Sequence, residues 1–406
     1  MQVTGSLARH KQMLKKIKDS REVAKAQRHR KEKPLCILCA FASVRERSLF
    51  FLQGFHFRNA NRKTTAHNPA AWLMTILLLA ATPLRSQETI TAPMDSIIKR
   101  IIPITINQKY DSALALCARL ERMPGGQAYG NFFKAAVLQS RILDHENDVG
   151  KDEFLAASKQ ARELFQKSLR KNSRSAICHF FIGATYGYEA FYFGKRDRLL
   201  DGFRTGWRCM QELNTALRLD HNLYDAYLAI GTFRYYQASI GKNFAWLPFI
   251  EDNREEAIAM IRKAIYHGKY SREAAINGLT WILIDEDREQ EALALVDSAL
   301  VEYPRSRFFL WGAAAANYRM EKWGEAERYY KLILETFAEE NFLPPYNAVS
   351  CYLRLAEINF YQANYAASRE QLAALYTVPI NGDDRKRCEK LIKQARDLEK
   401  VIYNSE

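Results

Sequence analysis

The sequence predicts an all-α fold, namely an extended solenoid built from antiparallel helix pairs. A helix and turn pattern returns after 34 residues, so that Ala292, Val296, Ala299 and Pro304 are repeated by Ala326, Tyr330, Ile333 and Ala338. Beyond Gln87, apolar residues recur at spacings of three and four, as in amphipathic helices, and alternating strand patterns are scarce. Because such pairs bury their apolar faces only against neighbouring pairs, we expect an array that grows along one axis and holds another molecule.

Seven helix pairs and a final helix are expected in order along the chain. The first pair is interrupted by Pro103 and ends at Pro124-Gly125-Gly126, so it is interpreted as an N-terminal cap. Pairs two to four are longer than the minimal repeat, pairs five and six are compact, and the charged last helix is expected to cap the far end. The expected ranges are 97–106 with 108–122, 128–143 with 153–169, 176–193 with 199–219, 223–240 with 253–267, 273–285 with 289–301, 307–320 with 324–337, 348–362 with 365–376, and 384–403.

The array resembles the tetratricopeptide repeat (TPR) family. Ile182-Gly183 and Tyr186 match the Leu-Gly-x-x-Tyr pattern of its first helix, and Ala292, Val296 and Pro304 match the Ala-x-x-x-Phe and Pro of its second helix. The resemblance spans residues 108–376 and implies a right-handed superhelical solenoid whose first helices line a concave face. The long helices with an apolar insertion are also faintly similar to a eukaryotic TPR family linked to clearance of inclusion bodies and lipid droplets. Small residues should let paired helices approach closely: Gly183, Gly231, Ala292 and Ala326.

Most of the net charge of +14 lies in the N-terminal part of the chain. Residues 1–73 contain 16 Lys and Arg against 4 Asp and Glu, whereas the remaining residues contain 44 against 42. The expected solenoid therefore has no large field that would attract a phosphate backbone. Nucleic acid is not expected as a partner.

Residues 70–84, AAWLMTILLLAATPL, form the one strongly apolar run and follow Arg58, Arg62, Lys63 and His67. A transmembrane helix needs about 20 apolar residues, so this run is interpreted as a signal peptide cleaved near Ser86. Because it begins far from Met1, either the true start lies downstream or the run is an uncleaved anchor with a basic cytoplasmic tail. We expect a basic extension over 1–57, a signal peptide over 58–87 and the solenoid over 88–406. The expected location is the periplasm or cell envelope of a Gram-negative bacterium, with membrane anchoring by residues 70–84 as the alternative.

The sequence shows no catalytic or metal-binding signature. Cys36 and Cys39 form the one CxxC, without a second ligand pair nearby, and the five later cysteines are odd in number and widely spaced. His179 is expected in the core or at its edge, and the acidic run Asp285-Glu286-Asp287 is interpreted as a solvated turn. We therefore expect neither an enzyme, nor a metal site, nor a cofactor.

Aromatic residues on the first helices are the candidate binding site. Aromatic side chains and Arg contribute strongly at interfaces because they bury large, rigid areas and retain a polar group. We expect a concave face that captures a peptide or protein segment and consists of Tyr188, Tyr235, Tyr236, Trp281, Trp311, Tyr318, Arg319, Phe360 and Tyr361. The matching positions lack the Lys and Asn with which TPR proteins clamp a C-terminal carboxylate, so that specificity is not expected.

The insertion over residues 244–250 supports an alternative function. It is almost entirely apolar and too costly to leave in water. Phe244, Trp246 and Phe249 would then roof a pocket between the long helices, and the protein would carry an apolar ligand. Packing of the insertion onto the core is the simpler interpretation.

Overall fold

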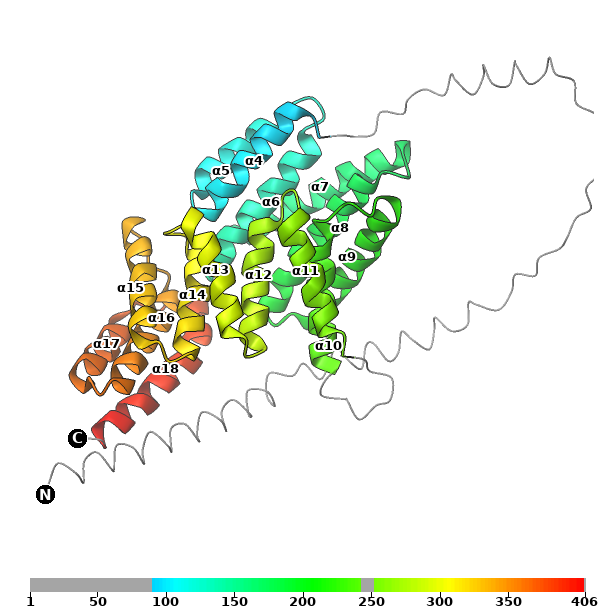
Figure 1. The fold of residues 1–406 in the computed structure, drawn as a ribbon. Coiled ribbons are helices and arrows are strands. Elements are labelled where there is room, and N and C mark those ends of the chain that lie inside the picture. The colour runs from blue at the N-terminus through cyan, green and yellow to red at the C-terminus, as the bar shows by residue number, and fades with distance from the viewer. Residues whose placement is uncertain (1–89, 242–251, 405–406) are drawn as a thin grey trace, which may run out of the picture.

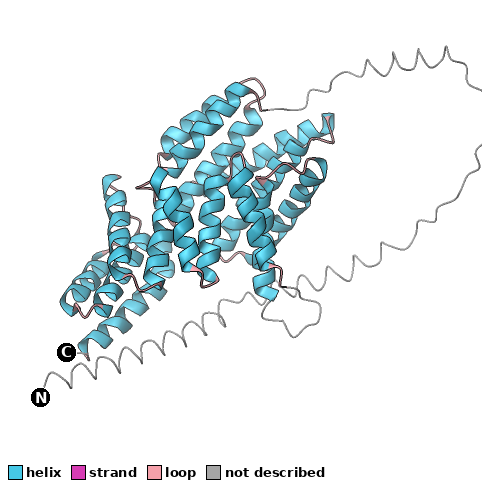
Figure 2. Ribbon diagram, in the orientation of Figure 1, coloured by secondary structure: helices cyan, strands magenta, loops and turns pink. Residues whose placement is uncertain are grey.

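A computed structural model describes residues 90–241 and 252–404, and within these ranges the chain forms fifteen helices and no strand (Figures 1 and 2). Successive helices pack as antiparallel pairs that stack on one another, so the predicted all-α solenoid is confirmed. The helices are α4 (Ala92–Ile106), α5 (Tyr110–Glu121), α6 (Gln127–Asp144), α7 (Lys151–Lys171), α8 (Ala176–Lys195), α9 (Leu199–Leu219), α10 (Ala226–Gly241), α11 (Arg254–His267), α12 (Arg272–Asp285), α13 (Glu289–Glu302), α14 (Arg307–Arg319), α15 (Trp323–Glu339), α16 (Pro345–Tyr361), α17 (Tyr365–Thr377) and α18 (Gly382–Tyr403).

The predicted ranges agree with these helices to within a few residues at most ends. The exception is α4, which begins earlier than expected and continues through Pro103. The predicted extension and signal peptide, including Cys36 and Cys39, lie outside the described residues. None of the described helices is long and apolar enough to cross a bilayer.

Five of the pairs close their first helix with the same turn. A non-glycine residue two positions before the second helix has φ between 55° and 61°, at Gln108, Asp197, Asp287, Glu321 and Ala363. In each turn the next backbone N–H donates to the carbonyl five residues earlier, as in Arg288 to Leu283 and Asn364 to Asn359. This is the Schellman arrangement, which satisfies the last carbonyls of a helix. The turn therefore repeats although its residue type does not.

Small residues allow the close helix packing that was predicted. A Cβ atom on Gly183 of α8 would lie 2.7 Å from Leu213 Cδ2 of α9, and one on Gly231 of α10 would lie 2.7 Å from the backbone oxygen of Ala257 in α11. Ala292 and Ala326 are fully buried in α13 and α15. These positions set the distance between the two helices of a pair.

The N-terminal helices do more than cap the array, because they also pack across later pairs. The hydroxyl of Ser306, at the start of α14, donates to the carbonyl of Ile106 at the end of α4 over 2.6 Å. The Tyr270 hydroxyl, before α12, donates to Asp95 of α4 over 2.5 Å, and its ring meets Phe133 of α6 edge-on. In Figure 1 the blue and cyan helices accordingly lie beside the yellow ones. The expectation that each pair contacts only its neighbours is wrong here.

A buried ion cluster holds this return contact together. Arg307 of α14 is 0% exposed, and its guanidinium lies 2.7 Å from Asp144 at the end of α6 and 2.8 Å from Glu340 after α15. The amide of Asn347 in α16 donates to the Asp144 carbonyl over 2.7 Å. Three later elements therefore meet the end of α6.

Candidate functional site

The first helices α10, α12 and α14 run side by side in parallel register. Leu228 near the start of α10 lies against Gly278 in the middle of α12, and the Tyr235 hydroxyl of α10 donates to Glu286 just past the end of α12 over 2.7 Å. Likewise Gly312 of α14 lies against Thr280 of α12. Residues at matching levels of these three helices are consequently neighbours.

Trp281 and Tyr236 are exposed on this row of helices. The first is 37% exposed at the middle of α12, and the second is 44% exposed near the end of α10. Trp281 shares one side of α12 with the exposed residues Ala274 and Asp285, since these positions are seven and four residues away. The register places Tyr236 level with the carboxyl end of α12. Trp281 and Tyr236 therefore expose aromatic surface to solvent on two adjacent helices.

Trp311 and Tyr361 extend the aromatic surface in half-buried form. Trp311 of α14 meets Tyr330 of α15 edge-on, with ring centroids 6.3 Å apart. Tyr361 of α16 stacks on Trp323 at 4.9 Å and a 15° interplanar angle. We define the aromatic face as Tyr236, Trp281, Trp311 and Tyr361.

Three other predicted residues are buried, and a fourth is partly buried, so their assignment to an open face is corrected. Tyr235 and Phe360 are in the core, and Tyr318 is only 8% exposed, with its hydroxyl donated to Glu357 over 2.7 Å. Tyr188 packs against Phe132 of α6, with ring centroids 5.4 Å apart. Helical spacing alone does not distinguish these positions, because in stacked pairs three sides of a first helix contact other helices.

The remaining predicted residue, Arg319, is engaged at the end of α14. Its guanidinium lies 2.7 Å from Glu289 and also pairs with Asp287, which holds it over the turn between α12 and α13. Its primary role in the fold is therefore to tie neighbouring pairs together.

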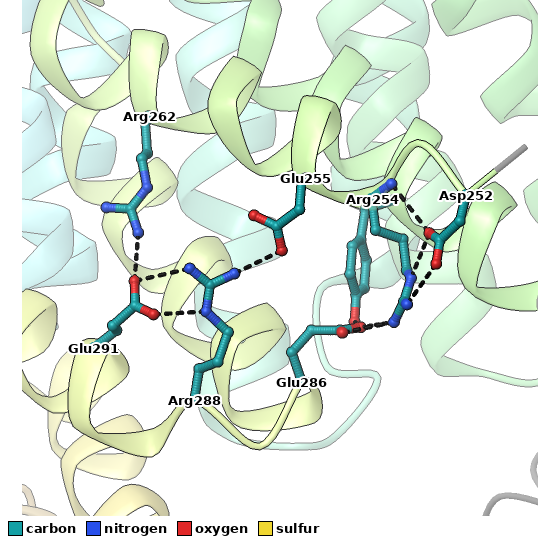
Figure 3. A network of polar contacts seen from close by, with 8 residues as sticks. Asp252, Arg254, Glu255, Arg262, Glu286, Arg288 and Glu291 are labelled. Atoms are coloured by element: carbon teal, nitrogen blue, oxygen red, sulfur yellow. Dashed lines mark hydrogen bonds and ion pairs between the residues drawn. The ribbon is translucent and has the colours of Figure 1, made fainter.

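A second ion network ties the same turn to α11. Arg254, at the start of α11, lies 2.6 Å from both Asp252 and Glu286, and Arg288 lies 2.8 Å from Glu255 (Figure 3). Glu286 is the acceptor for the Tyr235 hydroxyl as well. The network anchors the chain where it leaves the insertion between α10 and α11.

The alternative site cannot be placed on the structure. Phe244, Trp246 and Phe249 lie outside the described residues. A shallow pocket of about 350 Å³ does lie elsewhere, between the starts of α8, α10 and α12, and is lined by both apolar and charged side chains, among them Phe180, Asp220, Lys269 and Tyr270.

The described part of the chain contains no cluster of three or more potential metal ligands. His179 is half-buried, with Nδ1 2.6 Å from Glu212, as expected for a residue at the edge of the core. All five described cysteines are free and buried, and desolvation raises the pKa of Cys117 and of Cys209 to about 12, so their thiols stay protonated at neutral pH.

Comparison with known proteins gives structural likeness without close sequence relatives. No family profile matches the chain, and no curated protein sequence matches it. Among solved structures it is similar to PilW, described as a widely conserved type IV pilus biogenesis factor, with 16% identity and a TM-score of 0.41 over 63% of this chain and 98% of that one. It is also similar to the C-terminal part of a TPR-containing protein from Cytophaga hutchinsonii, with 15% identity and a TM-score of 0.38 over 73% and 98% of the two chains. The TPR domain of P58(IPK) matches with 16% identity and a TM-score of 0.25 over 82% and 86%.

Proposed function

We propose that this protein is an interaction scaffold that binds a peptide or protein segment on its aromatic face. The observation that carries the proposal is the exposure of Trp281 and Tyr236 on adjacent helices in the middle of the array. Both side chains expose large apolar surface to water, whereas most other large aromatics in the described ranges are buried or half-buried.

The chemistry of the face suits a segment more than a small molecule. Trp and Tyr bury large areas at a small cost in side-chain entropy, and each keeps a polar atom for a hydrogen bond. The row of parallel first helices offers such groups over several turns, and no enclosed cavity is needed to use them. Affinity would come mainly from buried aromatic area.

Export to the periplasm or cell envelope is part of the proposal. Its support is the apolar run 70–84 with its basic flank, which matches a signal peptide in length and polarity. Fractionation of cells carrying a C-terminal tag, together with the mass of the tagged chain, tests this. A tagged chain that begins near residue 87 and is released by osmotic shock supports cleavage. A full-length tagged chain in the membrane fraction supports the anchor.

Affinity capture tests the binding face. The tagged chain is compared with a double variant, Trp281→Ala with Tyr236→Ala, in pull-downs from the native envelope read by mass spectrometry. Tyr266→Ala is the matched control, because Tyr266 is 71% exposed on the second helix α11. Tyr318 is left intact, since its buried hydroxyl bond makes an alanine variant unstable for reasons unrelated to binding.

The two outcomes are distinct. A protein that is captured by wild type and by Tyr266→Ala, but lost with the double variant of unchanged helicity, identifies a partner of the aromatic face. The same capture by all three chains refutes the assignment of the face.

A further inference from the structure

The second helices of the array change in charge from its early pairs to its later ones. Helices α7 and α9 together contain nine Lys and Arg against five Asp and Glu, whereas α13 and α15 contain two against eight. The small net charge of the solenoid therefore conceals a basic region in its early pairs and an acidic region in its later pairs. Such a separation orients a protein in the field of a charged surface.

One side of α9 combines exposed cations with exposed apolar groups. Leu200, Arg204, Trp207, Gln211 and Arg218 follow one another at spacings of three, four and seven residues, so they form one stripe along the helix. All five are exposed, with Leu200 at 64% and Trp207 at 41%, and the buried residues of α9 lie on the opposite side. The stripe faces away from the core and contains no carboxylate.

The cations of α9 are not neutralised by its own acidic residues. Its three arginines form no ion pair with any residue in the ranges 90–241 and 252–404. The two carboxylates of the helix are engaged elsewhere: Asp201 lies 2.8 Å from Arg198, and Glu212 lies 2.6 Å from Nδ1 of His179. The positive charge of the stripe is therefore available to an anionic partner.

Arg208 joins this side of α9 to α7. Its guanidinium lies 5.7 Å over the Tyr186 ring of α8, and Arg162 of α7 lies 4.5 Å over the same ring. Glu189 of α8, whose charge also acts on Arg208, is paired with Arg162 at 2.5 Å. Because α8 is antiparallel to both helices, α7 and α9 run parallel, and the exposed Arg170 of α7 is level with the last turns of α9. We define the basic surface as Arg170, Leu200, Arg204, Trp207, Arg208 and Arg218.

We propose that the basic surface docks on a bilayer that contains anionic lipid, such as phosphatidylglycerol. An Arg side chain near such a bilayer is attracted by its negative surface potential, and Trp prefers the headgroup region. The exposed Leu200 and Trp207 favour a lipid partner over a soluble polyanion, because a polyanion offers no apolar environment to cover them. This inference does not depend on the proposed function, since the aromatic face lies on the first helices.

Oxidative footprinting tests the contact at the residue itself. The purified full-length chain is exposed to hydroxyl radicals with vesicles of phosphatidylglycerol and phosphatidylethanolamine, with vesicles of phosphatidylcholine alone, or with soluble polyphosphate. Peptide mass spectrometry gives the oxidation of Trp207, and Tyr266 is the internal control because it is 71% exposed on α11 and lies outside the basic surface. We expect the oxidation of Trp207 relative to that of Tyr266 to fall with the anionic vesicles and to stay constant with the other two additions. This readout holds whether or not residues 70–84 also insert into the bilayer.

Matched charge variants then locate the contact. The test variant removes three charges from α9 and keeps good helix formers: Arg204→Gln, Arg208→Gln and Arg218→Gln. The control variant removes three exposed cations from α18: Lys386→Gln, Lys393→Gln and Arg396→Gln. At low salt we expect the concentration of anionic lipid that gives half of the Trp207 protection to rise about 100-fold in the test variant. It should stay unchanged in the control variant, and circular dichroism checks that both variants keep the wild-type helicity.

Three results would overturn the proposal. The first is equal oxidation of Trp207 with anionic and neutral vesicles. The second is an equal loss of protection in the two charge variants, because net charge rather than the basic surface would then drive association. The third is protection by polyphosphate as strong as that by anionic vesicles, which assigns the surface to a soluble polyanion. The aromatic face is tested separately by affinity capture, so failure of either proposal leaves the other standing.

Discussion

Removing the charge of Arg307 should strongly destabilise the fold. In the variant Arg307→Met the aliphatic stem is kept, but the contacts to Asp144 and Glu340 at 2.7 and 2.8 Å are lost, as is the placement of the guanidinium 3.9 Å over the Phe337 ring. Asp144, whose side chain is 9% exposed, then becomes a buried carboxylate without its main partner. Breaking a buried pair in this way costs about 3–5 kcal/mol.

The neighbouring pair provides the control for this prediction. Arg305 lies 2.5 Å from Glu339, but both side chains are largely exposed, at 49% and 62%. The variant Arg305→Met should therefore cost less than about 1 kcal/mol. Guanidinium unfolding followed by circular dichroism gives both free energies, provided that the two variants share the wild-type denaturant slope. If Arg307→Met costs no more than Arg305→Met, the return of α6 onto α14 does not stabilise the array.

Three further variants test local features of the fold. Gly231→Ala should lower the unfolding free energy by about 1–3 kcal/mol, because its methyl group would meet the Ala257 carbonyl oxygen at 2.7 Å. Gly194→Ala is the control and should not lower it, because no atom lies within 4 Å of a Cβ at that position. Equal denaturation midpoints of the two variants would contradict the prediction. Ala363→Gly should raise the unfolding free energy by about 1 kcal/mol, since φ of 61° is strained for alanine; a lower thermal midpoint would show that this turn is not left-handed in solution. Desolvation tends to raise the pKa of Asp95, but hydrogen bonds from Tyr270, Lys269 and Lys99 outweigh it and lower this pKa from 3.8 to about 2. The ionised carboxylate therefore stabilises the folded state by about 2 kcal/mol above pH 3.8, and this stabilisation is lost as the pH falls through about 2. Acid titration of Asp95→Asn should therefore show a smaller loss between these pH values than wild type, and parallel curves would exclude the assigned contacts.

Local sequence patterns predicted the helices well because helix formation depends on residues that are close in the sequence. The spacing of apolar positions located the pairs from α8 to α17, and small residues such as Gly183 and Gly231 indicated where paired helices approach. The repeated left-handed turn was not visible, since Gln, Asp, Glu and Ala all occupy it. There the backbone hydrogen bonds of the preceding helix impose the conformation.

The candidate site was predicted only in part. Trp281 and Tyr236 are open as expected, but Tyr235, next to Tyr236, is buried, and so is Tyr318. Whether an aromatic residue at helical spacing is exposed depends on which neighbouring helix covers it. The acidic run Asp285-Glu286-Asp287 was interpreted as a solvated turn, but Glu286 pairs with Arg254 and Asp287 pairs with Arg319.

The sequence by itself determined the all-α class, the order of the pairs and the aromatic composition of the first helices, because each of these follows from residues within one or two helical turns. Only the tertiary structure decided that α4 and α6 return to α12, α14 and α16, since the contacts of Ile106 with Ser306 and of Asp144 with Arg307 join positions far apart in the chain. It also decided which aromatics remain open. The long-range contacts and the exposure of the aromatic residues both depend on how far each helix pair is rotated relative to the next. That rotation adds up over many packing angles, so a sequence pattern within one helix pair cannot predict it.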